Sequence, residues 1–229
     1  MNNSCRKIIC VTGKMASGKN TVCSILEQNG FICLDADKVV HSVIQKATPK
    51  ILDTFNELAT SKGIILTNQD GSLNRKALAE LLFQDKNLLK QQEEIIYPFV
   101  TEETQNFINI NSNKNIILNA TVLYKIPQLM KQCDYIFFVK SSAFQRFFRV
   151  CKRDKIKIKN IIQRFRSQKR LLQEYESTNI PIIKIHNRSN INILTKQIHK
   201  VLFCSIIYNP LFTNSSFVYS EYRNIEKFV

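Results

Sequence analysis

The most informative stretch of this sequence reads Gly13-Lys14-Met15-Ala16-Ser17-Gly18-Lys19-Asn20-Thr21. It follows a short apolar run, Lys7–Val11, and leads into a run with helical spacing, Thr21–Gln28. Two glycines that bracket four residues, with a lysine after the second, form the frame of a phosphate-binding loop. Glycines let backbone N–H groups curl around phosphate oxygens, and Lys19 would reach the outer phosphates. We predict that this stretch binds a nucleotide; the alternative is a glycine-containing turn with an exposed lysine.

The overall composition is that of a basic globular protein. The chain has 229 residues, of which 44% are hydrophobic, and a formal net charge of +15. This length and apolar content suffice to bury a core, so we expect one domain with insertions. The charge favours polyanionic partners, either phosphorylated small molecules or nucleic acid. A general bias toward Lys, Asn and Ile offers a second interpretation of the same charge.

Seven cysteines are present, and their spacing indicates neither a disulfide framework nor a metal site. No Cys-x-x-Cys pair occurs, and the three histidines stand in no zinc-like spacing. Several cysteines lie inside apolar runs, where a thiol behaves as a small buried hydrophobe. No window has the length of a membrane span, and the apolar run before Gly13 is too short for a signal peptide. We therefore predict a cytoplasmic protein that does not bind a membrane.

Five short apolar runs are predicted to form a parallel sheet: Lys7–Val11, Phe31–Leu34, Asn115–Leu118, Tyr135–Val139 and Ile182–Ile185. Each is a near-continuous run of β-branched or aromatic residues, which is typical of strands buried on both faces. Stretches with helical spacing separate them, so the pattern predicts an α/β fold with right-handed crossovers. Residues 48–112 are mostly helical in pattern, with a loop at 68–72, and we expect an insertion there that carries specificity.

An acidic pair, Asp35 and Asp37, follows the second predicted strand. Ligands of open parallel sheets gather at the carboxyl ends of strands, which places this pair near the phosphate loop. In an extended segment both side chains would point to the same side. We expect Asp37 to accept a proton from a hydroxyl group, with Asp35 supporting it. The alternative is that one of the two caps the next helix, and a cap is compatible with catalysis.

Taken together, these elements resemble the dephospho-CoA kinase family of P-loop kinases. The resemblance rests first on the phosphate loop and on the Asp35-Ala36-Asp37 element. Further segments follow in the family's order, over about residues 6 to 202: Gly71–Arg75 and the helix after it, Ile95–Pro98, Arg149, Arg153-Asp154, Gln168 and Asn187.

The sequence also departs from the family's pattern. Tyr97 replaces a histidine, Thr121–Lys125 replaces a Pro-Leu-Leu-x-Glu segment, and Asn20 replaces the usual hydroxyl ligand of magnesium. The amide oxygen of Asn20 can still coordinate a hard cation, with Thr21 nearby. We therefore expect Asn20 and Thr21 at the metal, with weakened Mg²⁺ affinity. For the part of the substrate site near Thr121, the sequence assigns no residue roles.

The resemblance implies phosphoryl transfer from ATP to the 3′-hydroxyl of dephospho-coenzyme A, with Mg²⁺ as the metal. The implied nucleotide contacts are Gly13, Lys14, Met15, Ala16, Ser17, Gly18, Lys19, Asn20, Thr21 and Asn187, the last at the adenine edge. The implied catalytic residues are Asp37 as base, Lys19, and Arg149 in a lid that excludes water. Asp35, Arg75 and Tyr97 are the implied substrate contacts.

The resulting division of the chain is a kinase domain over residues 1–203 and a tail over 204–229. Within the domain we expect the helical substrate-binding insertion at about 48–112 and a basic lid at about 144–160. The expected partner is the small-molecule substrate, with no nucleic acid, and a monomer is favoured.

Basic residues and phenylalanines alternate from about Phe144 to Arg170. We interpret this run as a lid with a solvated basic face; in a simpler version, the aromatic rings form a buried face. Stacking rings and phosphate-attracting charges would also suit a nucleic-acid-binding helix pair. Two rival functions therefore stay open. One is another small-molecule or nucleoside monophosphate kinase, and the other is a nucleotide-dependent nucleic-acid-binding protein without catalysis.

Overall fold

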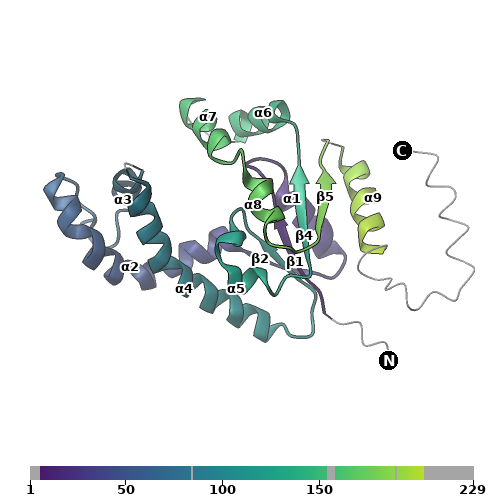
Figure 1. Ribbon diagram of the computed structural model, residues 1–229, viewed down its shortest axis with the longest axis horizontal. Coiled ribbons are helices and arrows are strands. Elements are labelled where there is room, and N and C mark those ends of the chain that lie inside the picture. The colour runs from purple at the N-terminus through teal and green to yellow at the C-terminus, as the bar shows by residue number, and fades with distance from the viewer. Residues whose placement is uncertain (1–5, 84, 154–157, 189, 204–229) are drawn as a thin grey trace, which may run out of the picture.

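Five parallel strands form the centre of the structure, a computed structural model that describes residues 6–83, 85–153, 158–188 and 190–203. The strands are β1 (Ile8–Thr12), β2 (Ile32–Asp35), β3 (Ile116–Asn119), β4 (Tyr135–Lys140) and β5 (Ile182–His186). Their order in the sheet is β2-β3-β1-β4-β5 (Figure 1). The predicted strands and the parallel α/β fold are confirmed, with β1, β2 and β3 each displaced by one residue.

Alternate residues of the central strand β1 enter two separate hydrophobic cores. Ile8 and Cys10 belong to one core, whereas Ile9 and Val11 belong to the other. Successive side chains of a strand point to opposite faces of the sheet, and all residues of β1 are buried. Burial on both faces is the physical reason for the continuous apolar runs in the sequence.

Helices cover both faces of the sheet. On one face lie α1 (Lys19–Gln28) and α9 (Ile191–Val201). The core on the other face is completed by residues of α2 (Ala36–Ser61), α3 (Arg75–Leu82), α4 (Lys86–Ile110), η1 (Leu123–Lys125), α5 (Pro127–Met130) and α8 (Leu171–Glu176). In Figure 1, α2 and α3 extend to the left of the sheet, and α6 (Ala143–Arg153) and α7 (Ile158–Ser167) stand above it.

The stretch predicted to be mostly helical, residues 48–112, contains the end of α2 and then α3 and α4. The first of these helices begins much earlier than residue 48, because α2 follows β2 directly at Ala36. Between α2 and α3, a bridge joins Thr67 to Leu73, and the carboxylate of Asp70 accepts a hydrogen bond from the N–H of Ser72 at 2.9 Å. The division of the chain into core, insertion and lid stays a prediction. Asp154 and the tail at 204–229 lie outside the described residues.

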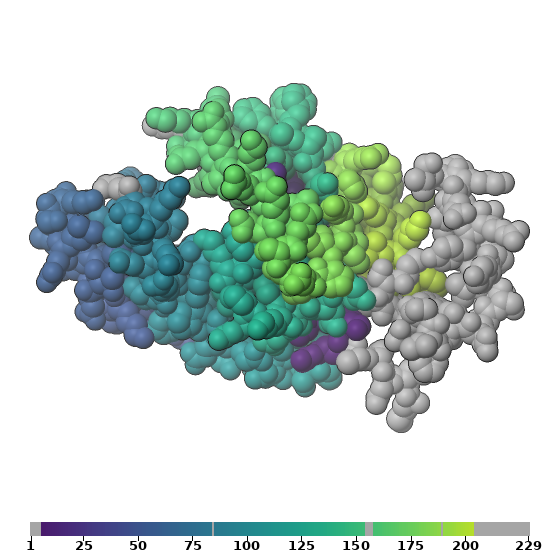
Figure 2. All heavy atoms as spheres, viewed as in Figure 1, coloured from purple at the N-terminus to yellow at the C-terminus, as the bar shows by residue number. Residues whose placement is uncertain are grey.

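Figure 2 shows an open hollow between α2–α3 on one side and α6–α7 on the other. The carboxyl ends of the strands point toward this side of the molecule (Figure 1). In open parallel sheets this is the edge at which ligands bind. Within the part of the chain that the structure describes, no helix has both the length and the apolar character needed to cross a membrane.

Candidate active site

The loop between β1 and α1 is shaped by two glycines that cannot be replaced without collisions. Gly13 has φ 151°, and a Cβ added there would lie 2.5 Å from the carbonyl oxygen of Val139. Gly18 has φ 97°, and its added Cβ would lie 2.0 Å from the side-chain nitrogen of Asn187. Ala16 also has a left-handed backbone, with φ 58°. Because L residues rarely adopt such conformations, the glycines at both ends are what lets the loop fold.

Several carbonyl groups of this loop are hydrogen-bonded from outside. Arg149 on α6 donates to the carbonyl oxygens of Ala16 at 3.1 Å and Ser17 at 3.2 Å. Asn187, directly after β5, donates from its amide to the Ser17 carbonyl at 2.9 Å and accepts from Arg149 at 3.3 Å. With these carbonyls fixed on the outer side, loop N–H groups other than those of Met15 and Ser17, which are hydrogen-bonded within the protein, can face an anion on the inner side.

Residues of the turn between α7 and α8 hold the first half of the loop. The N–H of Met15 donates to Gln168 Oε1 at 2.6 Å, and Lys14 Nζ donates to the Lys169 carbonyl at 3.3 Å. Gln168 lies in the turn between α7 and α8. Arg146 donates to the Met15 carbonyl at 3.5 Å, and its guanidinium lies 4.3 Å from the ring centroid of Phe165.

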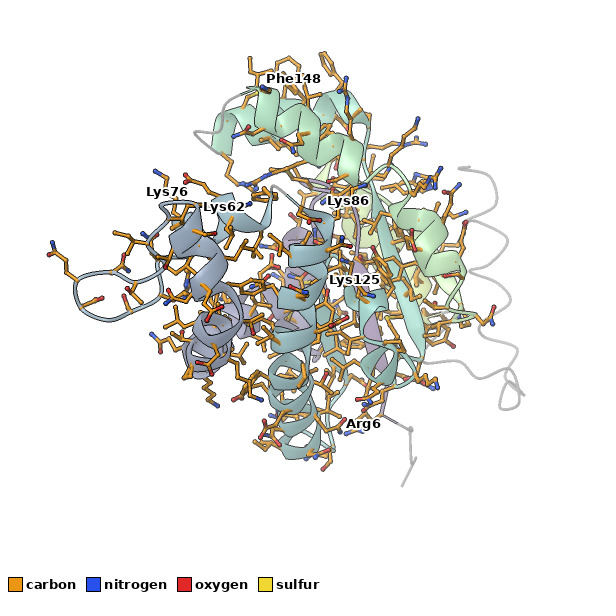
Figure 3. All side chains as sticks on the ribbon, turned by 60° about the vertical axis from the view of Figure 1, so that its left-hand side comes forward. Arg6, Lys62, Lys76, Lys86, Lys125 and Phe148 are labelled. Carbon is orange, nitrogen blue, oxygen red and sulfur yellow. The ribbon has the colours of Figure 1, made fainter. Side chains whose placement is uncertain are left out.

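Helix α6 turns an arginine toward the protein and two of its phenylalanines toward the solvent. Arg146 is buried, with 6% of its surface exposed, whereas Phe144 and Phe148 are 72% and 55% exposed. The interpretation of these two rings as a buried face is therefore wrong. Figure 3 shows Phe148 on the outer side of α6, away from the sheet. The physical reason is that the Arg146 guanidinium packs flat on Phe165 and reaches the loop, which occupies the inner face.

Lys19, the first residue of α1, folds back over the loop. Its Nζ donates to the Gly13 carbonyl at 3.1 Å. Burial lowers the pKa of the Lys19 ammonium group, the charges of Asp37 and Asp35 act in the opposite direction, and the positive charge of Arg153 lowers it further. Lys19, Asp37 and Arg153 are thus close enough to interact, although they come from α1, α2 and α6.

The acidic pair adopts a different local geometry from the extended one expected. Asp35 ends β2 and caps α2, and its carboxylate accepts a hydrogen bond from the Asp37 N–H at 3.0 Å. Asp37 lies in the first turn of α2, not in an extended segment, so the alternation argument is wrong. The capping alternative applies to Asp35. Asp37 thus lies where the helix dipole interacts favourably with an acidic side chain.

A magnesium site at the start of α1 is compatible with the side chains present. The amide nitrogen of Asn119, at the end of β3, donates to Asn20 Oδ1 at 3.1 Å. The other amide atom, Asn119 Oδ1, is a buried acceptor without a hydrogen-bond partner among the described residues. Hard cations accept carbonyl oxygens and often retain water, so the amide oxygens and the exposed Thr21 fit Mg²⁺.

The predicted substrate residues are only partly brought together. Arg75 begins α3 and contacts His41, which lies one turn after Asp37 on α2. Tyr97 instead lines a cavity of about 930 Å³ between α4 and α5, together with Lys125 and Ile126. The residues that line this cavity include none from the phosphate loop. Burial, followed by the charge of Glu93, raises the pKa of the Tyr97 hydroxyl.

The segment that departs from the family's pattern makes an ion pair and three hydrogen bonds with residues that are distant in sequence. Lys125 forms an ion pair with Glu93 of α4, and Figure 3 shows Lys125 beside that helix. The Thr121 carbonyl accepts hydrogen bonds from the Thr12 hydroxyl and the Tyr175 hydroxyl, both at 3.2 Å. Tyr175 also accepts from the Leu123 N–H at 3.0 Å.

Sequence reasoning missed three residues of this region: His41, Asn119 and Tyr175. His41 and Asn119 each follow an apolar run, whereas Tyr175 stands between two glutamates. The partner of each is distant in sequence. For Asn119, a polar residue at the carboxyl end of a central strand was an available signal, since the same argument selected Asp35. For His41 and Tyr175 the sequence offers no such signal.

The loop, the parallel sheet and the lid helices define a nucleotide-binding protein of the P-loop kinase class. The fold is similar to that of a Thermus thermophilus protein of known crystal structure, with a TM-score of 0.71, 22% identity, and coverage of 86% of this chain and 97% of that one. It is also similar to the structure of dephospho-CoA kinase from Campylobacter jejuni, with a TM-score of 0.56, 19% identity, and coverage of 86% and 96%.

The family model for dephospho-CoA kinase matches residues 7–192, so this chain belongs to the dephospho-CoA kinase family. Dephospho-CoA kinase from Treponema denticola is 35% identical over 79% of this chain and 82% of its own length. The enzyme of the same name from Treponema pallidum is 28% identical over 85% and 93%. The resemblance found in the sequence is confirmed, and with it an ATP-dependent kinase function.

Proposed function

We propose that this kinase transfers the γ-phosphate of ATP to the 3′-hydroxyl of dephospho-coenzyme A, with Asp37 as the general base. The observation that carries the proposal is the electrostatic interaction between Asp37 and Lys19. It connects the first turn of α2 with the phosphate loop, so that a proton acceptor and a phosphate-binding cation lie within electrostatic range of each other. Such transfers depend on positioning and charge stabilisation more than on covalent chemistry.

In the proposed reaction, the 3′-oxygen attacks the γ-phosphorus as its proton passes to the Asp37 carboxylate. The bond between that phosphorus and the oxygen bridging to the β-phosphate breaks, and ADP leaves with that oxygen. Asp35 supports Asp37 through the cap that fixes the first turn of α2. Lys19 and the loop N–H groups hold the phosphates, and their charge is already in place when negative charge develops.

Two lid arginines have different proposed roles. Arg149 is bonded to the loop carbonyls and to Asn187, so we assign it to fixing the loop and the adenine side of the site. Arg153 lies one helical turn further along α6 and its charge reaches Lys19. We therefore propose Arg153, and not Arg149, as the arginine that neutralises the transferring phosphoryl group.

Asn20 and Thr21, supported by Asn119, are the residues that would hold Mg²⁺. When bound, this ion supplies positive charge to the β- and γ-phosphates. The substrate is proposed to meet Arg75 and Asp35 across the hollow, with Tyr97 at a greater distance. A monomer, a cytoplasmic location and the absence of nucleic-acid binding stay predictions.

The first test measures ADP release with ATP, Mg²⁺ and dephospho-coenzyme A, for the unchanged chain and an Asp37→Asn variant. We expect substrate-dependent release that falls by about 10²- to 10⁴-fold in the variant, the usual range for loss of a general base. ATP binding should persist in the variant, because the loop is intact. The matched control is Asp53→Asn, an exposed carboxylate later on the same helix, which should retain full activity.

The opposite results are equally informative. Release that does not depend on dephospho-coenzyme A would reject the substrate. Release that survives Asp37→Asn would reject the base. If no transfer occurs at any Mg²⁺ level while single-stranded RNA binds in a salt-sensitive manner, the nucleic-acid-binding alternative replaces the proposal.

A further inference from the structure

The Arg75 side chain is held at two points by a single residue, His41. One terminal nitrogen of its guanidinium contacts His41 Nδ1, and the other donates to the His41 carbonyl oxygen at 3.2 Å. Arg75 is the first residue of α3, after the Asn74 cap, and His41 lies on α2 four residues after Asp37. Residues four apart share a face of a helix, so this contact connects Arg75 to the face that carries the proposed base.

The contact with Nδ1 requires a neutral imidazole ring. A guanidinium group has five N–H donors and no acceptor, so its partner nitrogen must keep a lone pair. In the neutral ring this places the hydrogen on Nε2; in the protonated ring both nitrogens are donors. Protonation therefore removes the acceptor and places a second positive charge against Arg75. The backbone contact alone would then remain.

His41 leaves most of the Arg75 donors unused. Two of the five N–H groups point at His41, and three remain for an anionic group. Planar bidentate recognition of phosphate is the property for which arginine is most suited. A guanidinium held at two points also loses less rotamer freedom on binding than a freely moving one.

We propose that neutral His41 is a positioning residue that presents Arg75 to a phosphate group of the acceptor substrate, so that the KM for this substrate rises when the ring is protonated. The His41 ring contacts Arg75. Along the two helices, the charged residues nearest in sequence are Asp37 and Lys38 in the preceding turn of α2, and Lys76 after Arg75 on α3. The proposal rests on the proposed function of Arg75 as a substrate contact.

A purely structural tie between α2 and α3 predicts something different. Loss of such a tie would lower the free energy of unfolding, or lower kcat and raise KM together through general loosening. A positioning role predicts a change in the KM for dephospho-coenzyme A, with kcat and ATP affinity nearly constant. The two roles are therefore separable by measuring each quantity.

The experiment measures kcat and KM for dephospho-coenzyme A at saturating ATP and Mg²⁺ between pH 5.5 and 8.5, which spans the range in which an imidazole changes charge. The variants are His41→Ala and His41→Asn, because the amide oxygen of Asn offers a similarly placed acceptor that does not titrate. For the unchanged chain we expect KM to rise about tenfold from pH 7.5 to 5.5, equal to about 1.4 kcal/mol. His41→Ala should have the high KM at every pH, and His41→Asn a low and nearly flat KM.

Two control variants test whether the change in KM is specific to His41 and acts through Arg75. His199→Asn, on α9, changes a histidine on the opposite face of the sheet and should keep the pH profile of the unchanged chain. Arg75→Ala should raise KM at all pH values, and adding His41→Ala to it should change nothing more. A flat KM in the unchanged chain, a normal KM in His41→Ala at pH 7.5, or an unaltered pH profile in His41→Asn would each overturn the proposal.

Different results are expected if Arg75 is not a substrate contact, or if the proposed function is wrong. If Arg75→Ala leaves KM unchanged, Arg75 is not a substrate contact and the role of His41 falls with it. If the unchanged chain does not phosphorylate dephospho-coenzyme A, the proposed function itself is rejected. Circular dichroism and ATP affinity of each variant establish that the fold is intact.

Discussion

The side-chain nitrogen of Asn187 lies 2.0 Å from the position that a Cβ atom on Gly18 would occupy. The same amide donates to the Ser17 carbonyl, one residue before that glycine. Asn187, the residue after the edge strand β5, therefore packs directly against the phosphate loop, and no side chain fits between them. Any group added at Gly18 displaces Asn187 as well as straining the loop.

Gly18→Ala is predicted to weaken ATP binding at least tenfold. The collision with Asn187 adds to the cost of a left-handed L residue, which is about 1–2 kcal/mol, and 1.4 kcal/mol already equals a factor of ten. Titration calorimetry with ATP measures the effect. In an Asn187→Ala background, which lacks the collision, Gly18→Ala should cost less affinity than it does in the unchanged chain, because only the backbone strain remains.

Gly30→Ala is the matched control for this prediction. Gly30 has φ 86°, close to that of Gly18, but nothing lies within 4 Å of its added Cβ. It should lower the free energy of unfolding by about 1 kcal/mol and leave the Kd for ATP unchanged. Equal losses of ATP affinity at both glycines would show that the contact with Asn187 is irrelevant.

ATP binding is predicted to take up protons at alkaline pH. Burial lowers the pKa of Lys19 below its ordinary value of 10.5, and bound phosphates would raise it again. As pH rises through the lowered pKa, the free protein loses the proton that the complex retains, so affinity falls with pH. Calorimetry in two buffers of different ionisation enthalpy, at pH 7.5 and 9.5, measures the uptake. It should be larger at pH 9.5.

Proton uptake by Lys19 must be distinguished from proton uptake by Lys14, the second lysine of the loop. Burial, together with the charges of Arg146, Lys140 and Lys169, also lowers the pKa of Lys14. A Lys14→Gln variant should keep most of the proton uptake. If the uptake disappears in that variant, or is absent from the unchanged chain at pH 9.5, the assignment to Lys19 is contradicted.

Asn20→Ser is predicted to lower the Mg²⁺ concentration that gives half-maximal activity, by roughly tenfold, within the range typical of changes around a metal ligand. In the unchanged chain the amide oxygen of Asn20 is shared with Asn119, whereas a serine hydroxyl would be free of that hydrogen bond. Mg²⁺-dependent binding of a fluorescent ATP analogue gives a second readout without turnover. Asn29→Ser, at the far end of α1, is the control. Saturation at the same Mg²⁺ level in Asn20→Ser and the unchanged chain would remove the hypothesis of weakened affinity.

Tyr175→Phe is predicted to lower the free energy of unfolding by about 1–3 kcal/mol, because it leaves the buried N–H of Leu123 without its acceptor. The ring contacts with Tyr124 and Phe138 are preserved. Urea denaturation measures the change. Tyr175→Leu, which also loses the ring packing, should cost more. A free energy of unfolding in Tyr175→Phe equal to that of the unchanged chain would show that the hydroxyl contributes nothing.

The sheet and the loop were predictable because their signals are local. Each strand is a continuous apolar run, since it is buried on both sides, and the loop is marked by glycines and Lys19 at fixed spacing. The positions of β1, β2 and β3 were off by one residue, because residues such as Lys7 flank a strand without belonging to it. The family followed from the order of these local signals.

The interactions within the site were less predictable because they pair distant positions. Met15 and Gln168, or Thr121 and Tyr175, meet only after the chain has folded. The burial of Arg146 was missed for a related reason: its burial depends on Phe165 and on the loop, and a spacing rule sees only a charged residue among phenylalanines. The error at Asp37 was local: α2 already begins at Ala36, so Asp37 lies in the first turn of a helix and not in an extended segment.

The packing of Asn187 against the phosphate loop also has a consequence for the folding of the chain during translation. A ribosome-bound nascent chain that ends at Lys140 already contains the whole loop, from Gly13 to Thr21, and the carboxylates that follow it. It lacks Arg149, Gln168 and Asn187, which hold the loop in shape. We therefore expect ATP to be captured only late in translation, once β5 has emerged and closed the edge of the sheet.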